Sequence, residues 1–257
     1  MKLKTLIGSL GFIMLLMYAN SSNSQTTSTD STWKKSYKNI IRYNISGALL
    51  FGFGNYLILG YERMVNPHQS FSINVGAAAL PKLVSINTDS FHLQKDLENK
   101  GFNLSADYRF YLRNENKYYA PHGVYIGPYI SYNSFNRKND WDFQRNSSEQ
   151  KLITTDTKFK ILSAGVELGY QFVFWKRVTL DMVLIGPGVS VYNLKVKANG
   201  NLTEDQKQNL NEALIDLISQ KFPGMNYVLA DKELDANGGL KTTSMGFRYL
   251  IHIGFAF

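Results

Sequence analysis

The stretch TSMGFRYLIHIGFAF, residues 243–257, decides the fold because it alternates in polarity along its whole length. One parity is wholly apolar or aromatic, whereas the other carries Arg248 and His252 among smaller side chains and Leu250. Successive side chains of a strand point to opposite faces, so the segment predicts a β-strand with one apolar face. A soluble sheet could bury that face, and a membrane barrel would turn it to lipid. The apolar parity comprises Met245, Phe247, Tyr249, Ile251, Ile253, Phe255 and Phe257.

Seven further segments alternate in the same way, so we predict an all-β fold: an eight-stranded antiparallel up-and-down transmembrane β-barrel. In the seventh segment, Gly186-Pro187-Gly188 predicts a kink and a change of parity. The expected strands are 40–50, 55–64, 70–79, 101–112, 123–133, 158–173, 178–192 and 243–257.

Apart from the first connection, 51–54, which is short, the connections between these segments alternate in length. After the second, fourth and sixth strands they are short, at 65–69, 113–122 and 174–177. After the third, fifth and seventh strands they are long, at 80–100, 134–157 and 193–241. Short periplasmic turns and long extracellular loops are typical of bacterial barrels, and they predict that both termini are periplasmic. A soluble eight-stranded barrel is the alternative, but its aromatic residues would face inward.

The N-terminus predicts export. A basic MKLK start precedes an apolar stretch at residues 6–19 and a polar tract at 20–25. This is the pattern of a secretory signal peptide, with cleavage expected after Ser24 or, alternatively, after Ala19. We therefore divide the chain into a signal peptide (1–24), a flexible periplasmic lead-in (25–38) and an outer-membrane β-barrel domain (39–257). The absence of Cys excludes a lipoprotein anchor and disulfides.

The composition also favours a barrel. Aromatic residues make up 14% of the chain, yet the mean hydropathy is only −0.22. This combination is expected when only alternate residues of each strand meet lipid. Past the signal peptide there is no apolar run of about 18 residues. The net charge is +8, but no dense Lys/Arg run or binding module indicates nucleic acid.

Four short segments carry a resemblance to known proteins: LGYER at 59–63, YIGPY at 125–129, LIGPG at 184–188 and GFAF at 254–257. With them the chain resembles the small eight-stranded outer-membrane barrels, and more narrowly the uncharacterised barrel families common in Bacteroidota. The resemblance implies location in the bacterial outer membrane and provides no catalytic residues. It also implies contact with outer-membrane lipid and lipopolysaccharide. The closing strand resembles the targeting signal that the barrel-assembly machinery reads, carried by Tyr249, Ile251, Ile253, Phe255 and Phe257.

The opposite parity predicts a charged barrel interior. Eight strands enclose a space just wide enough for side chains to fill, so buried charges there must pair. We expect a structural ion-pair network, and the alternative is a proton relay or acid/base pair at Glu167, Asp181 and His252. The expected network comprises Arg42, Glu62, Asp107, Arg109, Glu167, Asp181, Arg248 and His252.

Basic residues gather where the strands are expected to reach the outer surface. Cations at that level would contact the phosphates of lipid A, although ordinary solvated loop charge explains them equally well. The candidates for lipopolysaccharide contact are Lys82, Arg137, Lys138, Lys158, Lys160, Lys195, Lys197 and Lys241.

Aromatic belts are expected at both membrane interfaces. The periplasmic candidates are Tyr61, Phe71, Tyr108, Phe110, Phe172, Trp175 and Phe255. The outer candidates are Phe51, Tyr132 and Tyr192.

The last long connection predicts one short helix. Thr203 and Gln206 form a capping box, an apolar stripe runs from Leu210 to Phe222, and Pro223-Gly224 ends it. The helix would cover the barrel mouth or, alternatively, dock a second outer-membrane protein. The acidic run at 231–237 lacks the glycine of a calcium loop, so we expect no metal and no cofactor.

Together these features favour a non-enzymatic outer-membrane protein, either structural or a docking subunit of an envelope assembly. The alternative is a lipid A-modifying enzyme of the acyltransferase or deacylase type. Such a hydrolase needs a His–Ser–acid arrangement, and the chain contains four His.

Overall fold

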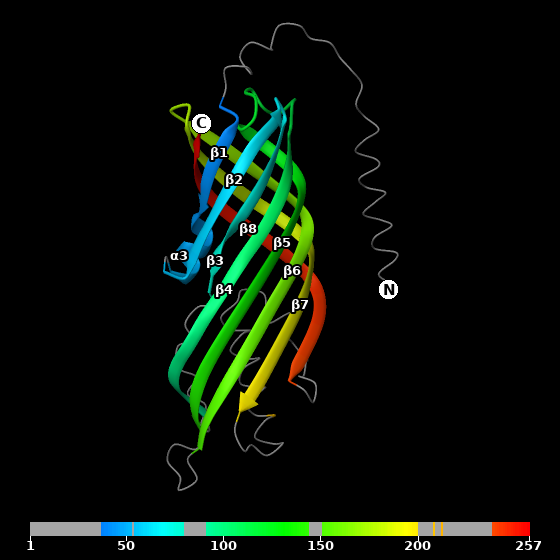
Figure 1. Cartoon of the computed structure of the whole chain (residues 1–257). Coiled ribbons are helices and arrows are strands. Elements are labelled where there is room, and N and C mark those ends of the chain that lie inside the picture. The colour runs from blue at the N-terminus through cyan, green and yellow to red at the C-terminus, as the bar shows by residue number, and fades with distance from the viewer. Residues whose placement is uncertain are drawn as a thin grey trace. The chain divides into compact units, whose positions relative to one another are not determined.

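The computed structural model describes residues 37–52, 54–79, 91–143, 151–199 and 238–257, together with Gln208 and Glu212. Each strand pairs antiparallel with the next, and the last pairs with the first, so the sheet closes into an eight-stranded barrel (Figure 1). The predicted all-β fold, an eight-stranded antiparallel up-and-down barrel, is therefore confirmed. The strands are β1 (Asn39–Asn44), β2 (Tyr56–Asn66), β3 (Gln69–Ala78), β4 (Phe91–Tyr111), β5 (Gly123–Phe143), β6 (Lys151–Phe174), β7 (Val178–Asn199) and β8 (Gly239–Ala256), with one short helix, α3 (Ile45–Phe51).

The two ends of the barrel sequence meet at one rim. The Asn39 amide donates to the Phe257 carbonyl at 3.2 Å, and the Phe257 amide donates to the Asn39 carbonyl at 2.8 Å. The short connections β2–β3, β4–β5 and β6–β7 lie at this same end (Figure 1). One rim of the barrel, which we call the rim of tight turns, thus holds the short connections, the start of β1 and the end of β8.

The first strand is shorter than its predicted bounds of 40–50. β1 ends at Asn44, whose side chain accepts a hydrogen bond from the Ser46 amide and so caps α3. The helix ends before Gly52, which adopts a positive φ of 91°. An Asn cap stabilises a helix start, and this signal overrides the alternation that predicted a continuing strand. The prediction that residues 45–50 continue the first strand is therefore wrong.

Five strands extend beyond their predicted bounds on the side of the long connections. β4 begins at Phe91 instead of 101, β5 ends at Phe143, β6 begins at Lys151, β7 ends at Asn199 and β8 begins at Gly239 instead of 243. The predicted loops 80–100, 134–157 and 193–241 are wrong over these residues, because the strand pairing continues there. We call residues 91–100, 134–143, 151–160, 193–199 and 239–242 the extension; all of them except 158–160 lie beyond the predicted strands. Figure 1 shows that β4–β7 continue far beyond β1–β3.

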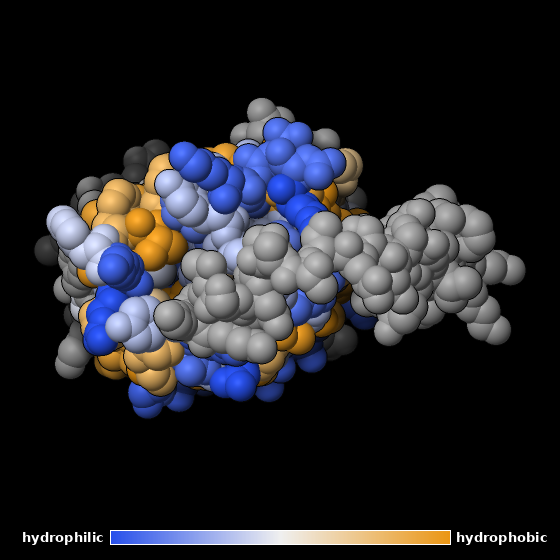
Figure 2. All heavy atoms as spheres, turned by 90° about the horizontal axis from the view of Figure 1, so that it is seen from above, coloured by the Kyte–Doolittle hydropathy of each residue, from blue (hydrophilic) through white to orange (hydrophobic). Residues whose placement is uncertain are grey.

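The barrel exterior carries an apolar band between the extension and the rim of tight turns, as predicted from the alternation. On β5 the outward positions change from Ile130 and Tyr132 to Ser134, Asn136 and Lys138. In the view along the barrel, hydrophobic residues form much of the visible sides (Figure 2). The most exposed large apolar side chains of the band include Leu57, Leu59, Ile73, Val75, Phe102, Leu104, Ile130, Leu162, Met245, Phe247, Tyr249 and Ile253. No helix among the described residues has the length and apolar character needed to cross a bilayer.

The predicted change of parity in the seventh strand is confirmed. The register of β7 against β8 shifts between Val183 and Gly186, and Leu184 and Ile185 are both exposed. Past the shift, Tyr192 faces the interior and is buried. Its prediction as an outer-belt residue is therefore wrong, because the shift reverses its face.

The predicted helix at 203–222 lies outside the described residues except for Gln208 and Glu212. Both are helical, and the Gln208 amide donates to the Glu212 carboxylate at 3.1 Å. Residues 1–36, which include the expected signal peptide, and the side chain of Phe51 lie outside the description as well.

Candidate functional site

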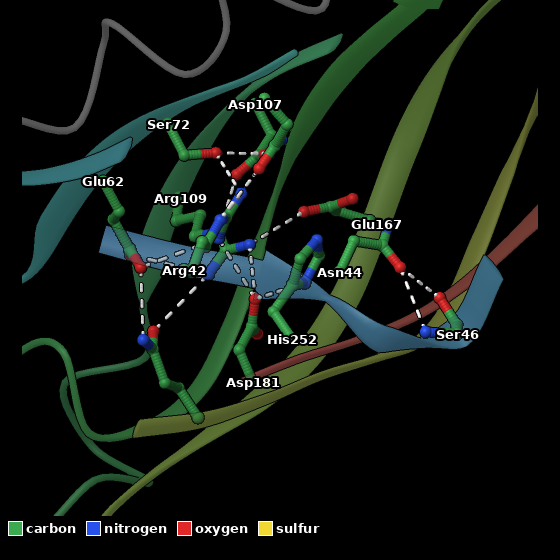
Figure 3. Close-up of polar contacts among 12 residues, drawn as sticks. Arg42, Asn44, Ser46, Glu62, Ser72, Asp107, Arg109, Glu167, Asp181 and His252 are labelled. Carbon is green, nitrogen blue, oxygen red and sulfur yellow. Dashed lines mark hydrogen bonds and ion pairs between the residues drawn. The ribbon is translucent and has the colours of Figure 1, made fainter. Parts of the chain in front are cut away.

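The eight residues predicted to form the interior network all face inward and are buried. They come from six strands, so barrel closure brings together groups far apart in sequence. Figure 3 shows most of them converging on a single cluster. β1 contributes Arg42, β2 Glu62, β4 Asp107 and Arg109, β6 Glu167, β7 Asp181, and β8 Arg248 and His252.

Arg42 lies near the centre of the cluster. Its guanidinium reaches Asp181 at 3.1 Å and Asp107 at 3.2 Å, and its Nε donates to the Asn74 amide oxygen at 3.0 Å. It also donates to the Ser72 hydroxyl, which in turn donates to Asp107 at 2.6 Å. These bonds neutralise the charge and occupy the guanidinium donors, as burial requires.

Arg109 is held in the same manner. Its Nε reaches Asp107 at 2.6 Å and its Nη2 reaches Asp181 at 2.8 Å, while the guanidinium carbon lies 4.3 Å from the centre of the Tyr125 ring. Asp181 accepts a further hydrogen bond from the Tyr125 hydroxyl at 2.7 Å and contacts His252 Nδ1 at 3.2 Å. Asp181 therefore joins both arginines and His252.

Glu62 is anchored mainly by neutral groups. Its carboxylate accepts hydrogen bonds from Ser70 at 2.7 Å, from Tyr111 at 3.1 Å and from the Gln171 amide at 3.1 Å. Ion-pair distances to Arg109 and Arg42 are longer, at 3.5 and 3.6 Å. We call Arg42, Glu62, Asp107, Arg109 and Asp181 the bonded cluster.

Arg248 and Glu167 are paired more loosely. Arg248 Nη1 lies 3.5 Å from Glu167 Oε2, and Nη2 lies 3.8 Å from Asp107. Within the described part of the chain, neither terminal nitrogen of Arg248 and neither oxygen of Glu167 has a hydrogen-bond partner. The Arg248 guanidinium packs on the Tyr129 ring at 4.8 Å. We call Arg248 and Glu167 the loose pair.

The sequence analysis missed the neutral members of the network. It named only charged residues, yet hydroxyl and amide groups complete the coordination of the carboxylates. The signal that could have found them is parity, because each lies at an inward-facing position of its strand. The missed residues are Ser70, Ser72, Asn74, Tyr111, Tyr125 and Gln171.

This arrangement closes the interior at the level of the cluster. Side chains from opposite walls are in hydrogen-bonding contact, so little room is left for an aqueous path, as expected for eight strands. His252 belongs to the network, and neither of its ring nitrogens has a hydrogen-bond partner among the described residues. In the same residues, no three His, Asp or Glu side chains are placed to hold a metal ion.

Two other histidines lie at the rim of tight turns. His68 packs edge-on against Tyr119, and His122 packs against Tyr118 and Tyr170. Partial burial lowers the pKa of both imidazoles, and Arg113 lowers that of His68 further. Both rings therefore favour their neutral form. The side chain of His92 lies outside the described residues.

The predicted lipopolysaccharide contacts divide into two groups. Six lysines are exposed on the outside of the extension, on neighbouring strands. Arg137 is instead buried on the inner face, where its Nε donates to Asn139 at 3.2 Å, so this candidate is wrong. Lys82 lies outside the described residues. We call the exposed group the lysine belt: Lys138, Lys158, Lys160, Lys195, Lys197 and Lys241.

The inner face of the extension is partly aromatic. Phe159 stacks on Phe135 at 6.4 Å and on Tyr192 at 6.3 Å between ring centres. All three side chains are buried, as are Leu194 and Val196. This part of the barrel therefore has a mixed interior, in which aromatic and aliphatic side chains lie beside Arg137 and Asn139, and a basic exterior.

A closed antiparallel barrel with an apolar outer band and a charged, buried interior has the architecture of membrane-spanning β-barrels. The chain belongs to the family described as "Protein of unknown function (DUF3575)", which matches residues 58–213. No protein of curated function matches the sequence significantly.

Among solved structures, the chain is similar to the crystal structure of Acinetobacter baumannii CarO2. The two are 10% identical, and the match covers 86% of this chain and 98% of that chain at a TM-score of 0.36.

Proposed function

We propose that the protein is a non-enzymatic β-barrel of the bacterial outer membrane, with both termini periplasmic, that serves as a structural or docking subunit of an envelope assembly. The observation that carries the proposal is the bonded cluster. Its charges are occupied by one another and by neutral neighbours, which is the arrangement of a structural plug. A porin would need a water-filled interior, and a hydrolase would need a nucleophile beside its base.

The orientation follows from the two rims. Export delivers the chain to the periplasm, and short turns face that side in bacterial barrels. The rim of tight turns holds Asn39 and Phe257. The extension then projects from the outer leaflet into the medium, and the lysine belt lies just above the apolar band.

The lysine belt supports contact with lipopolysaccharide. Lys158 and Lys195 lie directly opposite each other in the β6–β7 register, and like charges in that position repel. Asp156, opposite both Lys197 and Lys138, is an acid in register with the belt. Phosphates of outer-leaflet lipid would neutralise the remaining lysines at the level where they lie.

The docking role is tested by co-purification under mild detergent. We expect the full chain to retain one reproducible outer-membrane partner, and a chain lacking residues 202–222 to lose it while still inserting into the membrane. Recovery of the same partner by both chains, or of none by the full chain, would contradict docking.

The non-enzymatic role is tested separately, by mass spectrometry of lipid A from cells with and without the gene. We expect identical acyl chains. An acyl-chain difference that disappears in a His252→Gln variant would favour the lipid A-modifying alternative.

A further inference from the structure

A cavity of about 270 Å³ lies inside the barrel, on the side of the bonded cluster that faces away from the rim of tight turns. Arg248 of the loose pair contributes to its lining and is the one charged residue among the described residues that line it. Its volume is near the lower end of the range of small-molecule sites. The remaining wall is rich in hydroxyl and amide groups, including Ser105, Ser131, Asn103, Asn133, Ser163 and Ser190.

These wall groups retain hydrogen-bonding capacity. The Asn103 amide donates to the Asn133 oxygen at 2.8 Å, which leaves the Asn133 amide as a donor and the Asn103 oxygen as an acceptor. Ser163 and Ser190 share one hydrogen bond of 2.7 Å, so one hydroxyl hydrogen remains available. The cavity therefore offers neutral donors and acceptors side by side.

This chemistry discriminates among ligands. An apolar ligand would bury these donors and acceptors without hydrogen-bond partners, and each buried group would then cost its desolvation free energy. A cation would meet Arg248 and no acid on the cavity wall. A compact molecule with several hydroxyl groups satisfies donors and acceptors together, which is the chemistry of a sugar.

The barrel wall next to the cavity is incomplete. β1 pairs with β8 only from Ile40 opposite Ala256 to Asn44 opposite His252, and α3 then takes the place of the strand. Among the described residues, no backbone hydrogen bond joins α3 to β8. An unpaired strand edge is costly in lipid and is tolerated where it lines a polar cavity. We call this break between α3 and β8 the seam.

The cavity reaches the seam. Ser46 and Gly47 of α3 line it on one side, and Phe247 and Tyr249 of β8 on the other. Phe247 and Tyr249 belong to the outward parity, with 60% and 61% of their surface exposed. The same cavity is therefore bounded by inward-facing polar groups and by aromatic groups of the apolar band.

We propose that the cavity binds one sugar unit, held by the hydroxyl and amide wall and reached at the seam. The sugar comes either from the headgroup of an outer-leaflet glycolipid or from a free saccharide. The glycolipid source rests on the proposed membrane orientation, because only then does the seam face the outer leaflet. The aromatic rim of the seam favours the glycolipid, since its acyl chains would remain in the band.

The test uses the full mature chain in two arms. In the first, phosphatidylcholine nanodiscs contain monogalactosyl diacylglycerol, and native mass spectrometry measures the glycolipid retained by the protein. In the second, the protein in lauryldimethylamine oxide micelles, whose headgroup is not a sugar, is titrated with maltose and followed by saturation-transfer NMR. Ser131→Leu fills the cavity, and Ser134→Leu on the same strand, with outward parity, is the matched control.

We expect the wild type and Ser134→Leu to retain glycolipid equally and Ser131→Leu to retain at least tenfold less. Maltose binding with the same dependence would assign the cavity to free sugar. Absence of sugar in both arms, or equal binding by the two variants, overturns the proposal. If Ser131→Leu fails to show the heat-modifiable gel mobility of a folded barrel, Asn133→Leu with Asn136→Leu as control replaces the pair. A protein that inserts in the outer membrane yet binds no sugar contradicts this inference and leaves the proposed function intact.

Discussion

The apolar band and the extension are parts of the same strands, yet their outer faces differ in polarity. In the band, apolar side chains face out and charged side chains face in, as Ile130 and Glu167 show. In the extension, lysines face out, and Phe135 and Phe159 face in. The band follows the rule of a sheet in lipid, and the extension follows that of a sheet in water. In the proposed membrane orientation, the change on β5 between Tyr132 and Ser134 marks where the barrel leaves the membrane.

The largest expected effect concerns the interior of the band. Asp181→Asn removes the charge that joins Arg42, Arg109 and His252, and leaves two buried arginines short of a partner. Breaking a buried ion pair in this way costs about 3–5 kcal/mol. Urea unfolding in lipid vesicles measures the change. Glu98→Gln in the extension, which removes exposed pairs with Lys100 and Lys138, is the control and should leave the midpoint unchanged. Equal midpoints for the two variants would contradict a structural role for the bonded cluster.

The exterior of the two regions should respond differently to a charge. Ile130→Lys places an ammonium on the lipid-facing side of β5, which costs about 2–4 kcal/mol near the bilayer midplane and less toward the interfaces. Asn136→Lys, outward on the same strand in the extension, should cost under about 1 kcal/mol, because it stays in water and meets only the like charges of Lys100 and Lys158. The same unfolding assay compares them. A penalty at Asn136 as large as that at Ile130 would show that lipid reaches the extension.

Two neighbouring cations of β5, Arg137 and Lys138, lie on the inner and the outer face of the barrel, and their substitution should therefore have different effects. Arg137→Ala removes a buried side chain bonded to Asn139, so we expect a loss of about 1–3 kcal/mol. Lys138→Ala removes an exposed side chain and should be nearly neutral. Thermal unfolding of the two variants checks the difference. Similar melting temperatures would place Arg137 outside, with the lysine belt.

The smallest expected effect is a pH dependence at the rim of tight turns. Burial lowers the pKa of His122 from its ordinary value of 6.5, so the unfolded chain binds the proton more readily than the folded chain. Its contribution to stability is therefore complete above pH 6.5 and declines as the pH falls below it. Because the ring is partly exposed, the change should be under about 1 kcal/mol. The unfolding free energy should fall less between pH 7.5 and 5.5 in His122→Gln than in the wild type, and identical slopes would refute the assignment.

Sequence reasoning succeeded where lipid imposes a pattern. Outward Phe102, Leu104 and Ile130 alternate with inward residues because the bilayer penalises any polar outward side chain, and parity then also placed the eight network residues inside. The kink at Gly186-Pro187-Gly188 was predictable for a local reason, because Pro187 has no backbone N–H to donate to the strand ladder.

Sequence reasoning failed in the extension, where contact with lipid imposes no alternation of polarity. The extension reads as loop because its outward residues are polar and its inward ones mixed, and the pairing that makes it a sheet is not visible in any one segment. Arg137 was misplaced for that reason. Tyr192 was misplaced because the register shift in β7 reverses its face. The early end of β1 was missed because a local Asn44 cap overrides alternation. The contacts within the network and the seam depend on closure of the whole barrel, which periodicity does not encode.

The most direct test of the closed interior is conductance across a planar bilayer. Purified protein inserted at single-molecule level should show no steady open-channel current, because the bonded cluster joins opposite walls through Arg42, Arg109 and Asp181. A detergent blank and a known porin set the two reference levels. A steady conductance of porin size from the wild-type protein would contradict the account.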